Sequence, residues 1–260
     1  MISKAKRNSG DKNILVFAGP AGSGKTTAIR IAQEYLREKG VVFQNEIING
    51  FPLLIEKVRE DDFTGGLNHY HLWCKKGGGH THTNGTQTPH FPFVITGNYL
   101  WESMLAEITE SLLELPKDVV YFFELAGGKN TNPSDEPAFA VDHSFAKIRD
   151  CMSTKVFSDG WVNRCIAVFH PKTDLPLRKQ LNEKKSRFSS STIEEETGTA
   201  FAYKLPELMN IFGQDDFVEI DPYFRERGVP VFNVENKGDA HFREAVIGAL
   251  EECLSNRQTS

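Results

Sequence analysis

One octapeptide near the N-terminus has the residue types and the spacing of a loop that binds polyphosphate. It reads Gly19-Pro20-Ala21-Gly22-Ser23-Gly24-Lys25-Thr26, which matches GxxxxGK[ST]. The glycines let consecutive backbone N–H groups point into one concavity, where they hold phosphate oxygens mainly through the main chain. Lys25 would reach the β- and γ-phosphates of a nucleotide, and the Thr26 hydroxyl would bind Mg²⁺.

The segments on either side of the octapeptide give it the context that such a loop needs. A strand-like run, Ile14 to Ala18, leads into it, and an amphipathic helix with Ile29, Ala32 and Leu36 inward follows it. The N-terminus of that helix adds a partial positive charge. A glycine-rich turn without a ligand is the alternative, but it would leave the lysine charge unpaired beside a positive helix end. We therefore expect a nucleotide to be bound by Gly19, Gly22, Ser23, Gly24, Lys25, Thr26 and Thr27.

Five short apolar segments, each β-branched or aromatic and bounded by turn residues, are candidate strands. They are Ile14 to Ala18, Val41 to Ile48, Val119 to Glu124, Cys165 to Phe169 and Val229 to Val234. Several are apolar on both faces, as are the strands of a parallel sheet that helices cover. Segments with helical periodicity lie between and after them. The pattern predicts an α/β fold with a doubly wound, mostly parallel five-stranded sheet and helices on both faces.

The chain resembles the P-loop NTPase superfamily, and within it the nucleotide and nucleoside kinase-like group. The resemblance rests on the GPAGSGKTT loop, the five strands, a basic segment after the fourth strand that looks like a lid, and the ending from Val229 to Asp239. That ending is similar to the last strand and terminal helix of several small-molecule kinases. The resemblance implies phosphoryl transfer from ATP with Mg²⁺ as cofactor.

A phosphoryl-transfer enzyme needs an acidic group near the loop, either to hold Mg²⁺ or to take a proton from the acceptor hydroxyl. Glu124 ends the third predicted strand and is followed by Leu125-Ala126-Gly127-Gly128. Because parallel strands end at the same edge of a sheet, its carboxylate should emerge beside the phosphate loop. We expect Glu124 to be catalytic, as a base or through the metal. As an alternative, a glutamate at a strand end can cap the following turn.

A basic segment follows the fourth predicted strand and contains Arg178, Lys179, Lys184, Lys185 and Arg187. Kinases that the chain resembles carry a lid at this place, with arginines that fold over the γ-phosphate. A guanidinium group suits that role because its planar fork meets two phosphate oxygens at once. We expect Arg178 and Arg187 to be catalytic, on a lid-like segment over residues 175–200. A solvated charged helix would have the same pattern.

Asp142 precedes a short helix in the connection after the third predicted strand. Nucleoside kinases read their substrate from that connection, so the resemblance makes Asp142 a candidate substrate contact. Aspartate is also a good helix N-cap, and the position suits that role as well.

Residues 64–92 do not fit the repeat of strands and helices, and they predict an inserted loop or hairpin with Asn84-Gly85 as a turn. The segment holds six of the 21 glycines and five of the eight histidines. Zn²⁺ ligands could come from His69, His71, Cys74, His80 and His82, although the spacing matches no closed structural site. The insertion could instead fold over the acceptor, with His80, His82 and the amide of Asn84 or Asn98 binding a phosphate or a sugar. A solvated insertion is the third interpretation.

Asn236-Lys237-Gly238-Asp239 spells NKxD, a pattern that reads guanine in GTPases. Here it precedes the final helix, and no further strand with a second base-reading loop follows. We expect Asp239 to cap that helix, and we do not take the pattern as evidence for GTP.

The composition sets the remaining limits. Lys and Arg number 30 against 35 Asp and Glu, so the net charge of −5 gives solubility but no broad basic face for nucleic acid. The four cysteines form no CxxC, and no apolar run approaches the ~18 residues of a membrane span. Residues 1–13 lack the apolar core of a signal peptide and are expected to be flexible. We expect residues 1–260 to form one cytoplasmic domain. These observations are also compatible with a homodimer.

These observations predict an ATP- and Mg²⁺-dependent kinase of a small acceptor that is nucleoside- or nucleotide-like. One alternative is an ATPase or switch protein that acts on a protein or RNA partner and uses the insertion as a docking surface. Another is a toxin-like kinase of a nucleotide sugar. The basic lid-like helix favours a kinase over a switch.

Overall fold

The computed structural model describes residues 12–50, 53, 57, 70–72, 93–95, 98–129, 142–156, 158–188, 213–238 and 240–258. Within these residues a five-stranded sheet has the order β2-β5-β1-β6-β7, and its neighbouring strands are all parallel. The strands are β1 (Ile14–Gly19), β2 (Phe43–Asn49), β5 (Val120–Ala126), β6 (Cys165–Lys172) and β7 (Val231–Glu235). All five predicted strands are present, and the predicted α/β fold is confirmed.

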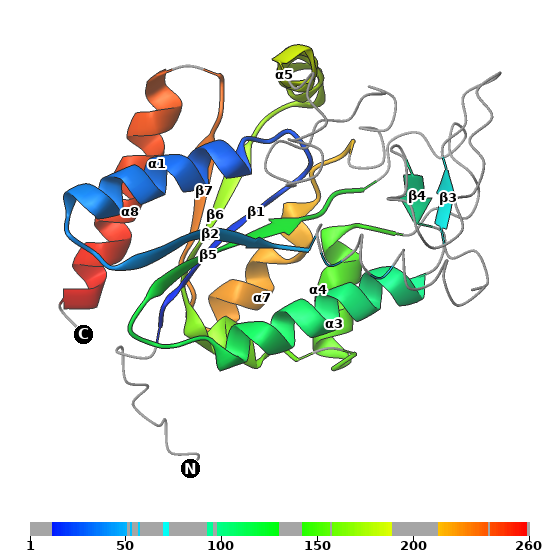
Figure 1. Ribbon diagram of the computed structural model, residues 1–260, viewed down its shortest axis with the longest axis horizontal. Coiled ribbons are helices and arrows are strands. Elements are labelled where there is room, and N and C mark those ends of the chain that lie inside the picture. Colours follow the sequence, from blue (N-terminus) through cyan, green and yellow to red (C-terminus); the bar gives the residue numbers. More distant parts are fainter. Residues whose placement is uncertain are drawn as a thin grey trace.

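Helices cover both faces of this sheet (Figure 1). One face carries α1 (Lys25–Glu38) and α8 (Ala240–Gln258). The other face carries α3 (Asn98–Glu114), α4 (Phe145–Ser153) and α7 (Asp221–Glu226), with the short 3-10 helices η2 (Gly160–Arg164) and η4 (Phe217–Glu219). Alternate side chains of β1 enter the two cores, with Leu15 and Phe17 toward α1 and Val16 toward α3. Because β1 is paired at both edges and covered on both faces, it is buried along its whole length.

β6 is longer than the predicted strand, which ended at Phe169. Its pairing with β1 stops at Phe169, but its pairing with β7 continues through Pro171 and Lys172. Proline has no N–H to give to a ladder, so it normally argues against a strand. Pro171 is tolerated because β6 pairs only with β7 at this residue, so β1 needs no N–H from it. The extension carries His170 and Lys172 to the carboxyl edge of the sheet.

A buried arginine ties the end of α3 to the start of β1. Arg164 donates to the carbonyls of Leu112 and Leu115, each at 2.7 Å, and its Nη2 donates to Asn13 Oδ1 at 2.9 Å. The last carbonyls of a helix have no partner within the helix, so the guanidinium caps the C-terminus of α3. Asn13 in turn donates to Val119 at 2.9 Å. These contacts hold the entries to β1 and β5, the two strands that lead into the predicted site.

A second, two-stranded sheet has one strand inside the predicted insertion and the other directly after it. β3 (Tyr70–Leu72) and β4 (Phe93–Ile95) pair antiparallel, with His71 opposite Val94. An antiparallel pair is what a hairpin would form here. The predicted turn at Asn84-Gly85 lies outside the described residues.

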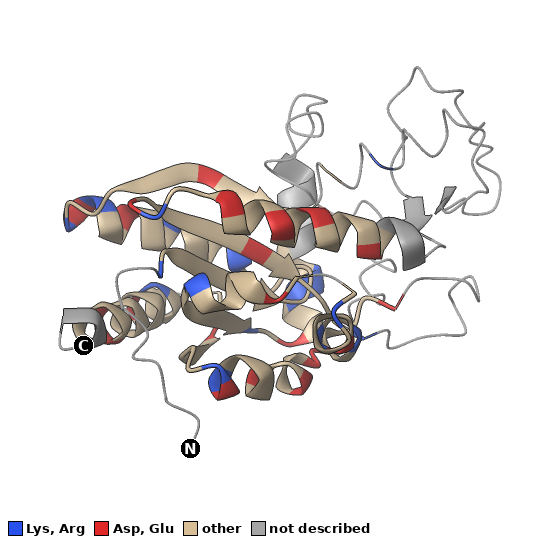
Figure 2. Ribbon diagram, turned by 90° about the horizontal axis from the view of Figure 1, so that it is seen from below, with Lys and Arg blue, Asp and Glu red and all other residues tan. Residues whose placement is uncertain are grey.

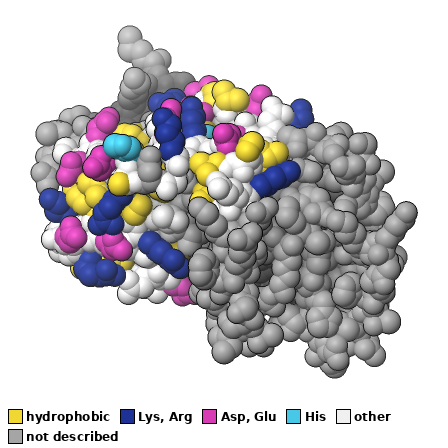
Figure 3. All heavy atoms as spheres, turned by 90° about the horizontal axis from the view of Figure 1, so that it is seen from above, with side chains coloured by type: hydrophobic (Ala, Val, Ile, Leu, Met, Phe, Trp, Pro, Cys, Tyr) yellow, Lys and Arg dark blue, Asp and Glu magenta, His cyan; other side chains and the backbone are white. Residues whose placement is uncertain are grey.

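Acidic and basic side chains are interspersed on the described surface. Acidic positions are spaced along α3, where Glu107, Glu110 and Glu114 are exposed (Figure 2). On the opposite layer Arg243 of α8 pairs with Glu34 of α1 at 2.6 Å, and Figure 3 shows basic and acidic side chains mixed on the face seen from above. Such faces do not favour a polyanion. Among the helices of the described ranges, none is long and apolar enough to cross a bilayer.

Candidate functional site

The phosphate loop leaves β1 at the carboxyl edge of the sheet and turns directly into α1. Gly22 and Gly24 have φ values of 77° and 101°, in the left-handed region that favours glycine. A Cβ at Gly24 would lie 2.3 Å from Asn236 Nδ2, so a side chain there is excluded sterically as well. Gly24 is the N-cap of α1, so the first N–H groups of the helix open onto the loop. This geometry fits the main-chain phosphate cradle that the sequence predicts.

Glu124 lies beside the loop, as predicted from its position at the end of a parallel strand. The register pairs it with Phe17 of β1. Its Oε2 accepts a hydrogen bond from Thr26 Oγ1 at 3.1 Å, and its Oε1 lies 3.6 Å from Lys25 Nζ. Lys25 also donates to the carbonyl of Pro20 at 3.0 Å. The structure therefore brings the predicted cation, the predicted metal ligand and the predicted acid into one cluster.

The charges of this cluster depend on one another. Lys25 is only 4% exposed, whereas Glu124 is 21% exposed. Burial lowers the pKa of the Lys25 ammonium from its ordinary value, and the charge of Glu124 opposes that shift. Glu124 thus favours the charged form of Lys25.

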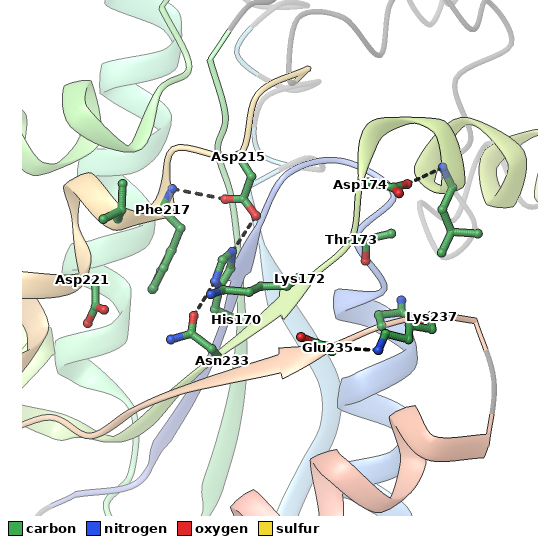
Figure 4. A pocket seen from close by; sticks show the side chains of 13 residues that line it. His170, Lys172, Thr173, Asp174, Asp215, Phe217, Asp221, Asn233, Glu235 and Lys237 are labelled. Atoms are coloured by element: carbon green, nitrogen blue, oxygen red, sulfur yellow. Dashed lines mark hydrogen bonds and ion pairs between the residues drawn. The ribbon is translucent and has the colours of Figure 1, made fainter.

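A cavity of about 590 Å³ adjoins the loop at the ends of β6 and β7. Its wall comes from these strands, from the start of α5 (Leu175–Phe188) and from η4 and α7 (Figure 4). Two of its lining residues, Thr173 and Asn236, donate to the Ser23 carbonyl of the loop at 2.9 and 2.8 Å. These two side chains therefore link the wall of the cavity to the phosphate loop.

His170 stands in this wall between two oxygen atoms, as Figure 4 shows. Its Nε2 lies 2.8 Å from Asp215 Oδ2 and its Nδ1 lies 2.9 Å from Asn233 Oδ1. The ring stacks on Phe217 with 4.1 Å between centroids. Asp215 Oδ1 also accepts from the N–H of Phe217 at 3.2 Å. His170 is 4% exposed and Asp215 is 23% exposed, so the carboxylate is the member of the pair that faces the cavity.

Burial raises the pKa of Asp215, but the hydrogen bond from His170, the Phe217 N–H and the Arg178 charge outweigh it, so the net pKa is lowered. A carboxylate whose folded pKa lies below its unfolded value of ~3.9 stabilises the fold above that pH. The stabilisation is lost as the pH falls through the folded pKa.

We expect Asp215→Asn to lower the free energy of unfolding at pH 7 by ~1.5–3 kcal/mol, the range for a hydrogen bond to a charged group. The difference from the wild type should begin to shrink as the pH falls below the unfolded value of ~3.9, and it should be lost as the pH falls further through the lower folded pKa. Urea unfolding at pH 7 and pH 3.5 measures both values. A difference that stays constant between these pH values would show that the Asp215 charge does not stabilise the fold.

Arg178 is one of the predicted lid arginines, and its side chain is 1% exposed. It donates to the carbonyl of Ala21 in the phosphate loop at 3.3 Å and to that of Gly213. Burial lowers the pKa of this guanidinium, and the charges of Asp215 and Asp174 oppose the shift. Arg178 therefore brings a buried charge to the loop while its N–H groups bind backbone carbonyls. The lid-like segment begins as the predicted helix, and Arg187 lies in α5 with its side chain outside the described part.

Asp142 does not cap α4. The N-cap is Ser144, whose Oγ accepts from the N–H of Lys147 at 3.1 Å. Asp142 is exposed and accepts from the N–H of Ser144 at 2.9 Å, so the N-cap interpretation of Asp142 is wrong. The segment is held against the connection after β5, because the N–H of Gly128 donates to the carbonyl of His143 at 3.0 Å.

Several predicted site residues lie outside the described part of the chain. These are His69, Cys74, His80, His82, Asn84 and Asp239, and of His71 and Asn98 only the backbone is described. Within the described residues no group of three or more His, Cys, Asp or Glu side chains could hold a metal ion.

Sequence reasoning missed His170, Asp215 and Thr173. His170 could have been predicted from the sequence. It directly follows an apolar strand segment, and in sheets of this kind the residues after such strands lie at the edge where ligands bind. Asp215 carried no comparable signal, because it comes from a loop far along the chain.

No protein-family model and no curated protein matches the chain. Among solved structures, shikimate kinase from Acinetobacter baumannii in complex with shikimate is similar over 94% of each chain, with 13% identity and a TM-score of 0.42. TT1252 from Thermus thermophilus is similar over 93% of this chain and 97% of its own, with 16% identity and a TM-score of 0.37. The strand order and the loop geometry of this chain define its fold. The chain therefore has a P-loop type of α/β fold, with a parallel sheet of this strand order and a glycine-rich loop between β1 and α1.

Proposed function

We propose that this protein is an ATP- and Mg²⁺-dependent kinase that phosphorylates a small acceptor of nucleoside- or nucleotide-like chemistry. The observation that carries the proposal is the cluster of Lys25, Thr26 and Glu124, with a carboxylate 3.1 Å from the threonine hydroxyl and 3.6 Å from the lysine ammonium. Phosphoryl transfer requires a phosphate cradle, a cation, a metal ligand and an acidic group in one place.

The donors in this cluster fit Mg²⁺, which prefers oxygen ligands from hydroxyl groups and carboxylates. Thr26 Oγ1 and the carboxylate of Glu124 would hold the ion, directly or through water. When bound, Mg²⁺ neutralises charge that develops on the phosphate oxygens. The loop N–H groups and Lys25 bind and orient the same phosphates. Glu124 either keeps the metal in place or accepts the proton of the acceptor hydroxyl.

The cavity beside the loop fits the nucleoside half of the nucleotide. Its volume of about 590 Å³ lies within the usual range of ligand sites. Asp174, Asp221 and Asn233 in its wall offer hydrogen-bond partners for sugar hydroxyls and base edges. On the acceptor side, Asp142 with Asn98, His80 and His82 remain the predicted contacts.

The alternative of an ATPase or switch protein would need a surface for a protein or RNA partner. The described helical faces mix both signs of charge, which supports a small-molecule acceptor over RNA. A kinase of nucleotide sugars would use the same phosphate loop and differ in the acceptor.

A screen of acceptors tests the proposal. Nucleosides, nucleotides, sugars and nucleotide sugars are added to the protein with Mg²⁺ and a non-hydrolysable ATP analogue, and unfolding temperatures are measured. One class should add a shift beyond that of the analogue, since a ligand at 100 times its Kd stabilises by about 2.7 kcal/mol. Stabilisation by RNA alone, with no small molecule effective, would contradict the kinase assignment.

A further inference from the structure

The Ser23 carbonyl, inside the phosphate loop, accepts two side-chain hydrogen bonds. Thr173 Oγ1 donates at 2.9 Å from beyond the end of β6, and Asn236 Nδ2 donates at 2.8 Å from beyond the end of β7. A carbonyl oxygen has two lone pairs, so these two donors fill its capacity. The loop is thus attached to the ends of two neighbouring strands through one of its own peptide groups.

Both donors are themselves held in place. Thr173 and Asn236 are 8% and 6% exposed. Asn236 Oδ1 accepts from the N–H of Gly238 at 2.9 Å, and the Asn236 N–H donates to the carbonyl of Lys172 at 2.8 Å. The asparagine amide therefore has a defined orientation, with its NH₂ toward the loop.

Fixing this carbonyl also fixes the next N–H. Because a trans peptide is planar, the C=O of Ser23 and the N–H of Gly24 point in opposite directions. With the carbonyl turned toward the strand ends, the Gly24 N–H turns away from them, toward the phosphate side of the loop. Gly24 is fitted to this arrangement, since its φ is 101° and a Cβ on it would meet Asn236 Nδ2 at 2.3 Å.

We propose that Thr173 and Asn236 are positioning residues that hold the Ser23–Gly24 peptide in its phosphate-binding orientation, so that they set the affinity for the triphosphate group whatever the base. A flexible glycine loop would lose conformational entropy when it binds phosphate. A loop that these two hydrogen bonds hold in place has already lost that entropy on folding, so binding costs less. Asn236 of the NKxD pattern thus acts on the loop backbone and does not read the base. The inference rests on the proposed function only in that the loop must bind a nucleotide.

Calorimetric titration with Mg²⁺ and either ATP or inorganic tripolyphosphate, which has no base, tests this role. Thr173→Val and Asn236→Ala should each weaken the binding of both probes by the same factor, ~3–10-fold for one hydrogen bond. Thr173→Ser keeps the hydroxyl and should bind both probes like the wild type. The double variant should lose less than the product of the two single losses, because both bonds act on one carbonyl.

The outcomes separate this inference from the proposed function. Weaker binding of ATP with unchanged binding of tripolyphosphate would make Asn236 a base contact and overturn the inference alone. Unchanged binding of both probes by the variants would overturn it as well. If the wild type binds neither probe, the proposed function fails and this inference fails with it.

Discussion

Lys25→Ala is expected to remove most of the stabilisation that ATP and Mg²⁺ give to the protein and to lower phosphoryl transfer at least ~10²-fold, as loss of one preorganised charged donor does. The ammonium is buried at the base of the loop, 3.0 Å from the Pro20 carbonyl and 3.6 Å from Glu124. Thermal unfolding with and without ATP, together with an assay of ADP formation, measures both effects.

Lys39→Ala is the matched control, because Lys39 is exposed at the opposite end of α1. It removes the same charge and should leave the ATP-induced shift unchanged. An equal shift in the Lys25 variant and the wild type would mean that this loop is not the nucleotide site.

Glu124→Gln should retain nucleotide binding while turnover falls by ~10²–10⁴, the range for loss of a positioned acid–base group. The glutamine keeps the shape of the side chain but removes the charge near Thr26 and Lys25. Because Lys25 and the N–H groups of the loop still hold the phosphates, nucleotide binding should survive the substitution. Calorimetric binding and steady-state rates give the two quantities separately.

Glu110→Gln, on the exposed face of α3, provides the comparison and should change neither quantity. If Glu124→Gln turned over at the wild-type rate, Glu124 would be a turn residue, and Asp142 and Asp215 would become the carboxylates to test.

The strands were predictable because apolar runs between turn residues reflect burial on both faces. Glu124 could be placed beside the loop from its position at the end of such a run, since parallel strands share an edge. The end of β6 could not be placed, because Pro171 opposes a strand in general and is tolerated only where β1 no longer pairs.

The contacts between distant segments were not predictable. Asp215 reaches His170 from a loop 45 positions later in the chain, and nothing in the local sequence encodes that approach. Aspartate caps helices well, which made Asp142 a candidate cap of α4, whereas the chain places Ser144 at the helix start. The NKxD pattern marks Asn236 in the sequence, but the hydrogen bond from Asn236 to Ser23 depends on how β7 lies beside the loop.

The most direct test of the kinase assignment is ³¹P NMR of the products that the wild-type protein forms from ATP and Mg²⁺ with the acceptor from the stabilisation screen. The cluster of Lys25, Thr26 and Glu124 predicts ADP together with an equal amount of a new phosphate ester or phosphoanhydride on the acceptor. Glu124→Gln should lose that signal while it still binds ATP. Formation of ADP and inorganic phosphate alone, at a rate that the acceptor does not change, would contradict the assignment and favour an ATPase.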